Sequence, residues 1–340
     1  MFDTPPQSTS VAEFSILLIL IIALALLFDF SNGWHDSANA VATVVSTRVL
    51  SPVLAVLFAG VLNVIGAFMS TAVAKMVGNG IIDPAAINDV VIISALGGAI
   101  VWNFITLRMG LPSSSSHALI GAMVGAGFIH GGVEVLQGAG LMKVMEAMVS
   151  SPLLGFLAAF MLMVGLSWAF FRTSRGRAMR LFRRLQLLSA GFMALSHGAN
   201  DAQKAMGIIT LALLSAGHIP SAEVPKWVII SCALSMGLGT ALGGWKIIRT
   251  LGMRIAKLDP VHGFAAETGA GVVLMVTAHI GLPVSTTHTI TSSIMGVGAV
   301  NRLSAVRWGV TKRIAYAWIF TLPGSAFLAV AFYLLLSAFF

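Results

Sequence analysis

A polar stretch interrupts the first long apolar segment of this 340-residue chain. Residues 29–39 read Asp-Phe-Ser-Asn-Gly-Trp-His-Asp-Ser-Ala-Asn, between the apolar runs 14–28 and 40–46. A membrane interior cannot solvate carboxylates and amides, so these side chains must face a protein cavity or an aqueous path. The stretch therefore predicts a membrane protein with a functional site inside the bilayer.

Composition supports the same class. The chain is 57% hydrophobic and only 9% charged, with a mean hydropathy of +0.94, whereas soluble domains carry about 25% charged residues. A single cysteine, Cys232, excludes a disulfide scaffold and a Cys-based zinc site. The net charge of +8 does not indicate nucleic acid, because the basic residues fall in short loops, where they act as orientation signals.

The polar pattern returns 165 residues later as His197-Gly-Ala-Asn-Asp-Ala-Gln-Lys204. In this match Asp36 pairs with Asp201, and Asn39 pairs with Lys204. A polar interruption that occurs once in each half is typical of transporters built from internal repeats, in which discontinuous helices form the site. We therefore expect both apolar segments to be interrupted at these positions.

A second motif is also duplicated. Residues 110–117, Gly-Leu-Pro-Ser-Ser-Ser-Ser-His, match residues 281–288, Gly-Leu-Pro-Val-Ser-Thr-Thr-His, with an offset of 171. Proline ends one helix and suits the start of the next, so the hydroxyl groups would lie at helix N-termini, which bind anions. One copy alone would indicate ordinary helix capping, whereas two matched copies favour an anion site.

The fold class predicted is an all-α polytopic membrane protein with two inverted repeats of about five spans each. The six arginines of segment 172–184 mark the cytoplasmic side, so both termini are expected outside the inner (plasma) membrane. The pairs 90–129 and 264–300 are either two full spans each or re-entrant hairpins. The expected parts are an extracytoplasmic tail 1–13, a first repeat 14–171, an Arg-rich cytoplasmic linker 172–186 and a second repeat 187–340. The expected spans are 14–47, 52–77, 90–107, 112–129, 152–171, 187–216, 227–248, 264–282, 284–300 and 314–340.

These two duplicated motifs resemble those of the inorganic phosphate transporter family. The resemblance extends from about Asp29 to Trp318 and implies secondary phosphate uptake, a substrate site between the halves and commonly a homodimer. His35 and Lys204 stand where the family pattern has Asn, and both departures resemble the bacterial low-affinity, proton-coupled branch. The substrate-binding residues implied by the resemblance are Asp36, Asn39, Ser114, Ser115, Ser116, Asp201, Gln203, Ser285, Thr286 and Thr287.

The coupling ion is open at this stage. A sodium site needs oxygen ligands, and Lys204 supplies none, so we expect its ammonium group to act as a tethered cation. His35, with an ordinary pKa near 6.5, and Asp29 or Asp36 would then carry a proton. Sodium coupling and a divalent metal carried as a neutral metal–phosphate complex remain alternatives, and no metal ligands are assigned. The residues assigned to the coupling ion are Asp29, His35, Asn200, Lys204 and Glu267.

Other functions compete with phosphate transport. Sulfate is the main alternative substrate, because the same features would bind it. An intramembrane hydrolase using Ser115 or Ser116 with His117 is disfavoured, because adjacent helical residues point about 100° apart. No nucleotide-binding motif of the Gly-x4-Gly-Lys-Ser/Thr type occurs, which argues against a primary pump. We therefore expect a carrier rather than an enzyme, with no cofactor.

Overall fold

The computed structural model describes residues 15–83 and 86–339, so the expected extracytoplasmic tail 1–13 lies outside the described residues. The described part is helical, with one isolated bridge between Ile82 and Leu136. The first half comprises α1 Ile16–Ser46, α2 Pro52–Ala67, α3 Ala72–Asn79, α4 Asp89–Met109, α5 Ser115–Gly131 and α6 Gly138–Ala169. The second half comprises α7 Arg175–Ser215, α8 Lys226–Leu242, α9 Trp245–Arg254, α10 Pro260–His279, α11 Thr286–Ala299, the 3-10 turn η2 Leu303–Ala305 and α12 Trp308–Leu336.

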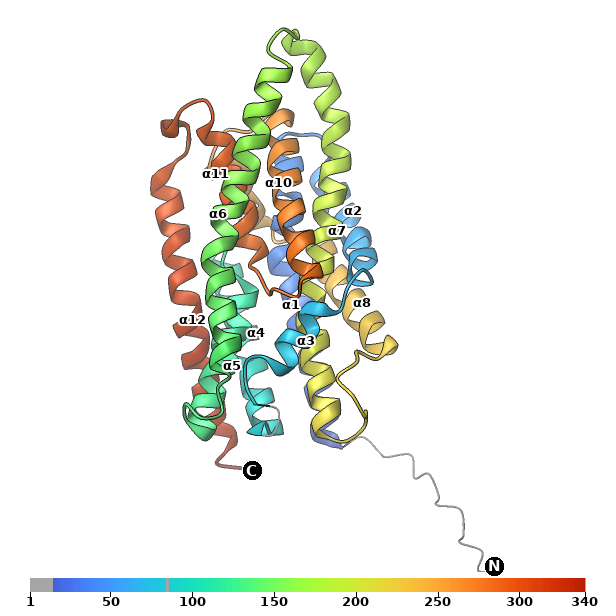
Figure 1. Ribbon diagram of the computed structural model, residues 1–340, viewed down its shortest axis with the longest axis vertical. Coiled ribbons are helices and arrows are strands. Elements are labelled where there is room, and N and C mark those ends of the chain that lie inside the picture. The colour runs from blue at the N-terminus through green and yellow to red at the C-terminus, as the bar shows by residue number, and fades with distance from the viewer. Residues whose placement is uncertain (1–14, 84–85, 340) are drawn as a thin grey trace, which may run out of the picture.

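The two halves run in opposite directions (Figure 1). The α6–α7 connection forms one end of the molecule, which we call the linker end. The start of α1 and the end of α12 lie together at the opposite end, which we call the terminal end. Helix α1 runs from the terminal end to the linker end, and α7 packs against it in the reverse direction. The predicted all-α fold of two repeats is therefore confirmed.

The polar stretches do not interrupt their helices, and that expectation was wrong. Residues 29–39 lie inside the 31-residue helix α1, and residues 197–204 lie inside the 41-residue helix α7. Backbone hydrogen bonds are satisfied within a helix whatever its side chains are, so buried polar residues need not break it. Helix α7 also begins at Arg175, so most of the Arg-rich segment is helical.

The breaks occur instead in the neighbouring helices. Helices α2 and α3 bend by 77° where a single span 52–77 was expected, and α8 and α9 bend by 67°. The α8–α9 bend falls at two consecutive glycines, of which Gly243 has a φ of +73°. Such a backbone conformation is accessible to glycine at little cost, which explains why the second break falls there.

The α4–α5 and α10–α11 pairs are hairpins whose tips meet. Each turn begins with a glycine of positive φ, Gly110 at +66° and Gly281 at +74°, and continues with Leu-Pro. The α10–α11 hairpin enters from the linker end and returns to it (Figure 1). The hydroxyl of Ser116, on α5, donates to the backbone carbonyl of Val284 before α11 at 3.2 Å. The tips therefore meet inside the molecule, which favours the re-entrant alternative.

Close helix crossings hold the two polar helices in place. A Cβ atom on Gly33 would lie 2.2 Å from the carbonyl oxygen of Met236 on α8, and one on Gly198 would lie 2.2 Å from that of Asn63 on α2. Only glycine permits this approach, which is common between membrane helices. By length and composition, five helices could cross a membrane, or seven if each bent pair counts as one span.

Candidate transport site

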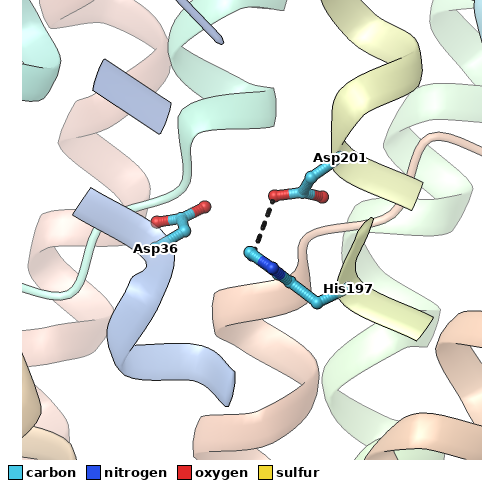
Figure 2. Close-up of side chains that lie close together, drawn as sticks. All are labelled: Asp36, His197 and Asp201. Atoms are coloured by element: carbon cyan, nitrogen blue, oxygen red, sulfur yellow. Dashed lines mark ion pairs between the residues drawn. The ribbon is translucent and has the colours of Figure 1, made fainter. Parts of the chain in front are cut away.

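The two polar helices bring Asp36 and Asp201 together at the centre of the molecule. One ligand atom from each of Asp36, His197 and Asp201 lies within 4.8 Å of the other two. Figure 2 shows the two carboxylates facing one another, with the His197 ring beside Asp201. All three side chains are buried. The proximity of the two acids is the arrangement that a shared site between the halves requires.

Asp36 is held by residues of both halves. Its Oδ1 lies 2.6 Å from Nδ1 of His35, and its Oδ2 accepts a hydrogen bond from the Ser115 hydroxyl at 2.8 Å. The Thr287 hydroxyl lies 3.5 Å from Oδ1. On its other side, the His35 ring contacts the hydroxyl groups of Thr106 and Ser113 at 3.1 and 3.2 Å. A buried histidine–aspartate pair of this kind can hold or move a proton.

Asp201 has a different set of neighbours. The Lys204 ammonium group lies 2.8 Å from its Oδ1, and Nε2 of His197 lies 3.4 Å from its Oδ2. The Thr286 hydroxyl donates to Oδ2 at 3.2 Å. Nδ1 of His197 lies 3.2 Å from the side-chain oxygen of Asn63. Because an amide oxygen only accepts, Nδ1 carries the proton and Nε2 is directed at the carboxylate.

The hydroxyl motifs form the first turns of α5 and α11. Ser114 and Ser285 are the N-caps, each accepting a hydrogen bond from the backbone N–H three residues later, at 3.2 and 3.1 Å. Ser115 and Thr286 follow at matched positions, and each donates to a different central carboxylate. An α-helix leaves its first backbone N–H groups without intrahelical acceptors. The two helix starts therefore place hydroxyl and N–H donors beside the acids.

Asn39 joins the halves. Its side-chain nitrogen donates to the hydroxyl groups of Thr286 and Thr287, at 3.1 and 3.0 Å. Those two hydroxyls in turn lie against Asp201 and Asp36. The amide therefore orients the start of α11 toward the central carboxylates.

Two further predicted residues lie in or near this cluster. Asp29 and Asn200 are fully buried, and none of their side-chain oxygen or nitrogen atoms has a hydrogen-bond partner in the described part of the chain. Asp29 interacts electrostatically with Lys204 and Asp201. Since buried polar atoms are nearly always bonded, these side chains are candidates for contact with a transported species.

Gln203 is placed differently from the expectation. Its side-chain oxygen accepts from the backbone N–H groups of Val73 and Ala74, at 2.7 and 3.2 Å, just after the α2–α3 bend. Its side-chain nitrogen donates to the carbonyl of Ala199. Both ends of the amide already have protein partners, so Gln203 fixes the bend against α7 rather than offering a free group to substrate.

Glu267 lies in a separate buried cluster toward the linker end. Thr43 donates to its Oε1 at 2.6 Å, Gln186 donates to the same oxygen at 3.0 Å, and Ser189 bonds Oε2. Thr43 follows Asp36 by seven residues on α1, which corresponds to about 10 Å along a helix. Glu267 is therefore a second acidic position, one to two turns from the central pair.

Sequence reasoning missed the partners of Glu267 and of His35. Gln186 was assigned to the linker, because the arginines before it suggested a loop, whereas α7 already includes it. Thr43 could have been found, since it lies two helical turns beyond Asp36 on the same face. Thr106 carries no local signal, and although Ser113 stands in the hydroxyl motif, only the hairpin places both residues against α1.

Two inverted halves with a buried polar site between them define a membrane transporter built from internal repeats. The chain belongs to the phosphate transporter family, whose model matches residues 32–179 and 172–329, one match in each half. It is similar to a probable low-affinity inorganic phosphate transporter of Rhizobium meliloti (strain 1021), at 49% identity over 93% of this chain and 96% of the relative. A protein of the same description from Bacillus subtilis (strain 168) is 48% identical, over 94% and 97%.

A solved structure shows the same fold. It is described as the sodium-dependent phosphate transporter and matches with a TM-score of 0.89 over 96% of this chain and 100% of that protein. The identity is 24%, so the likeness concerns the fold alone. Together with the family match, it identifies the chain as a non-enzymatic, multi-pass membrane transporter of the phosphate transporter family.

Proposed function

We propose that this chain imports inorganic phosphate by proton symport, holding the anion between the first turns of α5 and α11. The observation that carries the proposal is the matched pair of contacts Ser115–Asp36 and Thr286–Asp201, at 2.8 and 3.2 Å. Each half presents one helix start and one carboxylate to the same centre. Helix starts bind anions through free N–H groups and the positive end of the helix dipole.

These contacts suggest how protons and phosphate are coupled. A hydroxyl group has one proton to donate, and an ionised Asp36 accepts the proton of Ser115. A protonated Asp36 can donate to the Ser115 oxygen instead, which frees the hydroxyl proton for phosphate. Protonation therefore removes a repelling charge and supplies a donor to the anion at the same time.

The charges favour protons over sodium as the coupling ion. Asp29, Asp36 and Asp201 are all buried, and Lys204 is the fixed cation beside them. Phosphate adds further negative charge in a medium of low dielectric, where like charges repel strongly. The ammonium group supplies no oxygen ligand and lies against Asp201, where a sodium ion would otherwise compensate that carboxylate.

Sodium-free proteoliposomes test the coupling. With an acidic exterior, labelled phosphate should accumulate inside, and a protonophore should abolish the accumulation. The variants Asp36→Asn and Asp201→Asn should remain folded by thermal unfolding but show no accumulation. Strict dependence on sodium would contradict the proposal, and undiminished phosphate uptake in the presence of excess sulfate would exclude sulfate as an equivalent substrate.

One observation favours a second form of the substrate, the neutral metal–phosphate complex. Asp36, His197 and Asp201 offer oxygen and nitrogen ligands within 4.8 Å of one another, as a divalent cation prefers. A metal carried this way is cargo and leaves with phosphate. Equal molar uptake of Mg²⁺ or Zn²⁺ and phosphate, lost in the presence of a chelator, would support this form.

The linker end is proposed to face the cytoplasm. Six arginines of segment 172–184 lie there, and all six side chains are exposed. Cytoplasmic loops carry an excess of such residues. Both termini would then lie on the extracytoplasmic face of the inner membrane, in a homodimer as the family resemblance implies. Accessibility of cysteines introduced at Ser174 and Ser337 in intact cells tests the orientation.

A further inference from the structure

A cavity of about 440 Å³ lies beside the central site, between α1, α4 and the α8–α9 bend. Its walls include Trp34, Phe104, Arg108, Trp245 and Lys246. Trp34 directly precedes the His35–Asp36 pair on α1, so the cavity lies at the depth of the central site along that helix. We call it the basic pocket. Its volume lies within the range of small-ligand sites.

The basic pocket holds two cations without a counter-charge. Both side chains are exposed, and Nζ of Lys246 donates to the backbone carbonyl of Arg108 at 2.9 Å. This bond places both residues on one wall. The ion pairs found in the described part of the chain involve other side chains. Cations between membrane helices usually mark ion pathways or binding sites for anionic head groups.

The start of α9 adds to the positive potential. Helix α9 begins at Trp245, directly after Gly243 and Gly244, and its N-terminus faces the cavity that those residues line. The positive end of a helix dipole favours anions. Helix α9 then runs along α1 toward the linker end, since Gly244 packs on Trp34 and Gly252 packs on Ala42. The pocket therefore lies at the depth of the central site, and α9 leads from it toward the linker end.

Two hydrogen bonds connect the basic pocket to the site helix. The indole nitrogen of Trp34 donates to the carbonyl of Gly243 at 3.2 Å, and the backbone N–H of Gly244 donates to the Ser37 hydroxyl at 2.7 Å. These contacts hold the α8–α9 bend against α1 on both sides of His35 and Asp36. A ligand in the pocket would touch both Trp34 and this bend.

The repeat does not require these cations. The offset of 171 that relates the hairpins places His279 at the position of Arg108. At the opposite bend, Gly281 packs on Ala72 as Gly110 packs on Lys246, so alanine stands at the position of Lys246. The matched region near the terminal end therefore lacks both fixed positive charges. Because the fold is satisfied without them, the basic pair needs an explanation other than packing.

We propose that the basic pocket binds a phosphate group at a second site, separate from the central one. Arg108 supplies a planar fork of donors that suits phosphate oxygens, and Lys246 supplies a point charge. The phosphate group comes either from inorganic phosphate, on the basis of the proposed function, or from an anionic lipid, whose acyl chains would follow the exposed side chains of Met109 and Leu242.

Equilibrium binding to the full chain tests the proposal independently of transport. The protein carries Asp201→Asn, to weaken the central site, and is placed in nanodiscs of phosphatidylcholine with labelled phosphate. We expect one bound phosphate per chain, and a loss of affinity of about tenfold or more in Arg108→Gln and again in Lys246→Gln. The matched control is Arg249→Gln. Arg249 is an exposed arginine on α9, the helix of Lys246, but it lies outside the pocket, so this variant should bind phosphate normally.

A second arm distinguishes the source of the phosphate group. Brominated phosphatidic acid should quench Trp245 fluorescence if a lipid occupies the pocket, and Arg108→Gln should relieve the quenching. Binding in either arm that depends on both cations supports the proposal. Absence of binding in both arms, or binding unchanged in the Arg108→Gln/Lys246→Gln variant with an unaltered thermal midpoint, overturns it.

Discussion

One helix crossing occurs in matched form at the two ends of the molecule, and it contains a buried acid, Glu267, only at the linker end. The offset of 171 places Leu96 of α4 at the position of Glu267 on α10. The offset of 165 places Ile208 at the position of Thr43, and Ile21 and Leu24 at those of Gln186 and Ser189. Leu96, Ile21 and Ile208 are buried in one apolar cluster, with Leu24 packed against it. At the terminal end, the crossing of α4 with α1 and α7 therefore packs well with aliphatic side chains alone.

From this difference we propose that Glu267 has a role beyond packing. A buried carboxylate costs several kcal/mol in desolvation, which its hydrogen bonds only partly offset. The same crossing at the terminal end avoids that cost. We propose that an acid in the linker-end crossing holds a coupling proton on that side of the carrier, with the surrounding hydroxyl and amide groups as its hydrogen-bond partners.

A second difference lies at the centre. Asn39 and Lys204 occupy matched positions, yet Asn39 bonds to Thr286 and Thr287 whereas Lys204 pairs with Asp201 at 2.8 Å. One half thus uses a neutral donor and the other a fixed cation. Variants that give one half the residue of the other half test which of these differences affect phosphate uptake.

The largest effect is expected from Lys204→Asn, which makes the second half resemble the first. Removing one partner of a buried ion pair costs about 3–5 kcal/mol. Asp201 would then need another cation, so sodium-free uptake should fall by on the order of 100-fold. Added sodium should restore part of it. Lys143→Asn, at an exposed lysine outside the site, is the control; full uptake by Lys204→Asn without sodium would exclude the tethered-cation role.

Glu267→Gln should have a smaller and more selective effect. The amide fills the same volume but cannot carry a transported proton. We expect phosphate exchange between two equal pools to continue, while accumulation driven by a pH gradient falls by about tenfold. The matched change at the other end, Leu96→Met, should alter neither measurement. Equal losses of exchange and accumulation would assign Glu267 to stability instead of coupling.

A third comparison concerns the glycines that set the two helix crossings. Gly33→Ala and Gly198→Ala each place a Cβ atom 2.2 Å from a backbone oxygen, so the helices must separate. Each change should destabilise the protein by about 1–3 kcal/mol and reduce uptake through misplacement of Asp36 or Asp201. Gly165→Ala is the control, because nothing lies within 4 Å of its added atom. Unequal losses of thermal stability in the two variants would show that the crossings are not equivalent.

Much of the fold could be predicted from the duplicated motifs, because a motif that occurs once in each repeat occupies equivalent positions in the two halves. The pairs Asp36–Asp201 and Ser115–Thr286 were found from offsets alone, and the structure brings all four side chains together. The continuity of α1 and α7 was not foreseen, because hydropathy measures solvation and not backbone geometry. The actual break at Gly243 carried a local signal, two adjacent glycines, that was not used.

The second site cluster was harder to infer. Glu267 drew attention as a lone acid, but its partners come from two separate places in the chain: Thr43 on α1, and Gln186 and Ser189 one turn apart on α7. No periodicity links the two places, and only the packing of α10 against α1 and α7 brings them together. For Gln203, motif position predicted substrate contact, and the fold directs its side-chain oxygen to the backbone at the α2–α3 bend.

The smallest effect is expected at His262–Asp259, the surface counterpart of the buried His35–Asp36 pair. The two side chains of this surface pair lie 2.7 Å apart. Asp259 is the N-cap of α10. Burial raises the pKa of its carboxyl group, but hydrogen bonds from the His262 ring and from two backbone N–H groups outweigh burial and lower this pKa below its ordinary value. Because this pKa is lower in the folded state, the ionised carboxyl group of Asp259 stabilises the folded protein above the unfolded-state pKa, near 3.9. This stabilisation is lost as the pH falls through the folded-state pKa.

Asp259→Asn keeps the capping acceptor but not the charge, so its thermal midpoint should lie slightly below that of the wild type at pH 7 and converge with it near pH 3. Asp259→Ala should cost about 1 kcal/mol by loss of the cap. A midpoint difference between wild type and Asp259→Asn that stays constant from pH 7 to pH 3 would show that the surface pair contributes nothing through its charge.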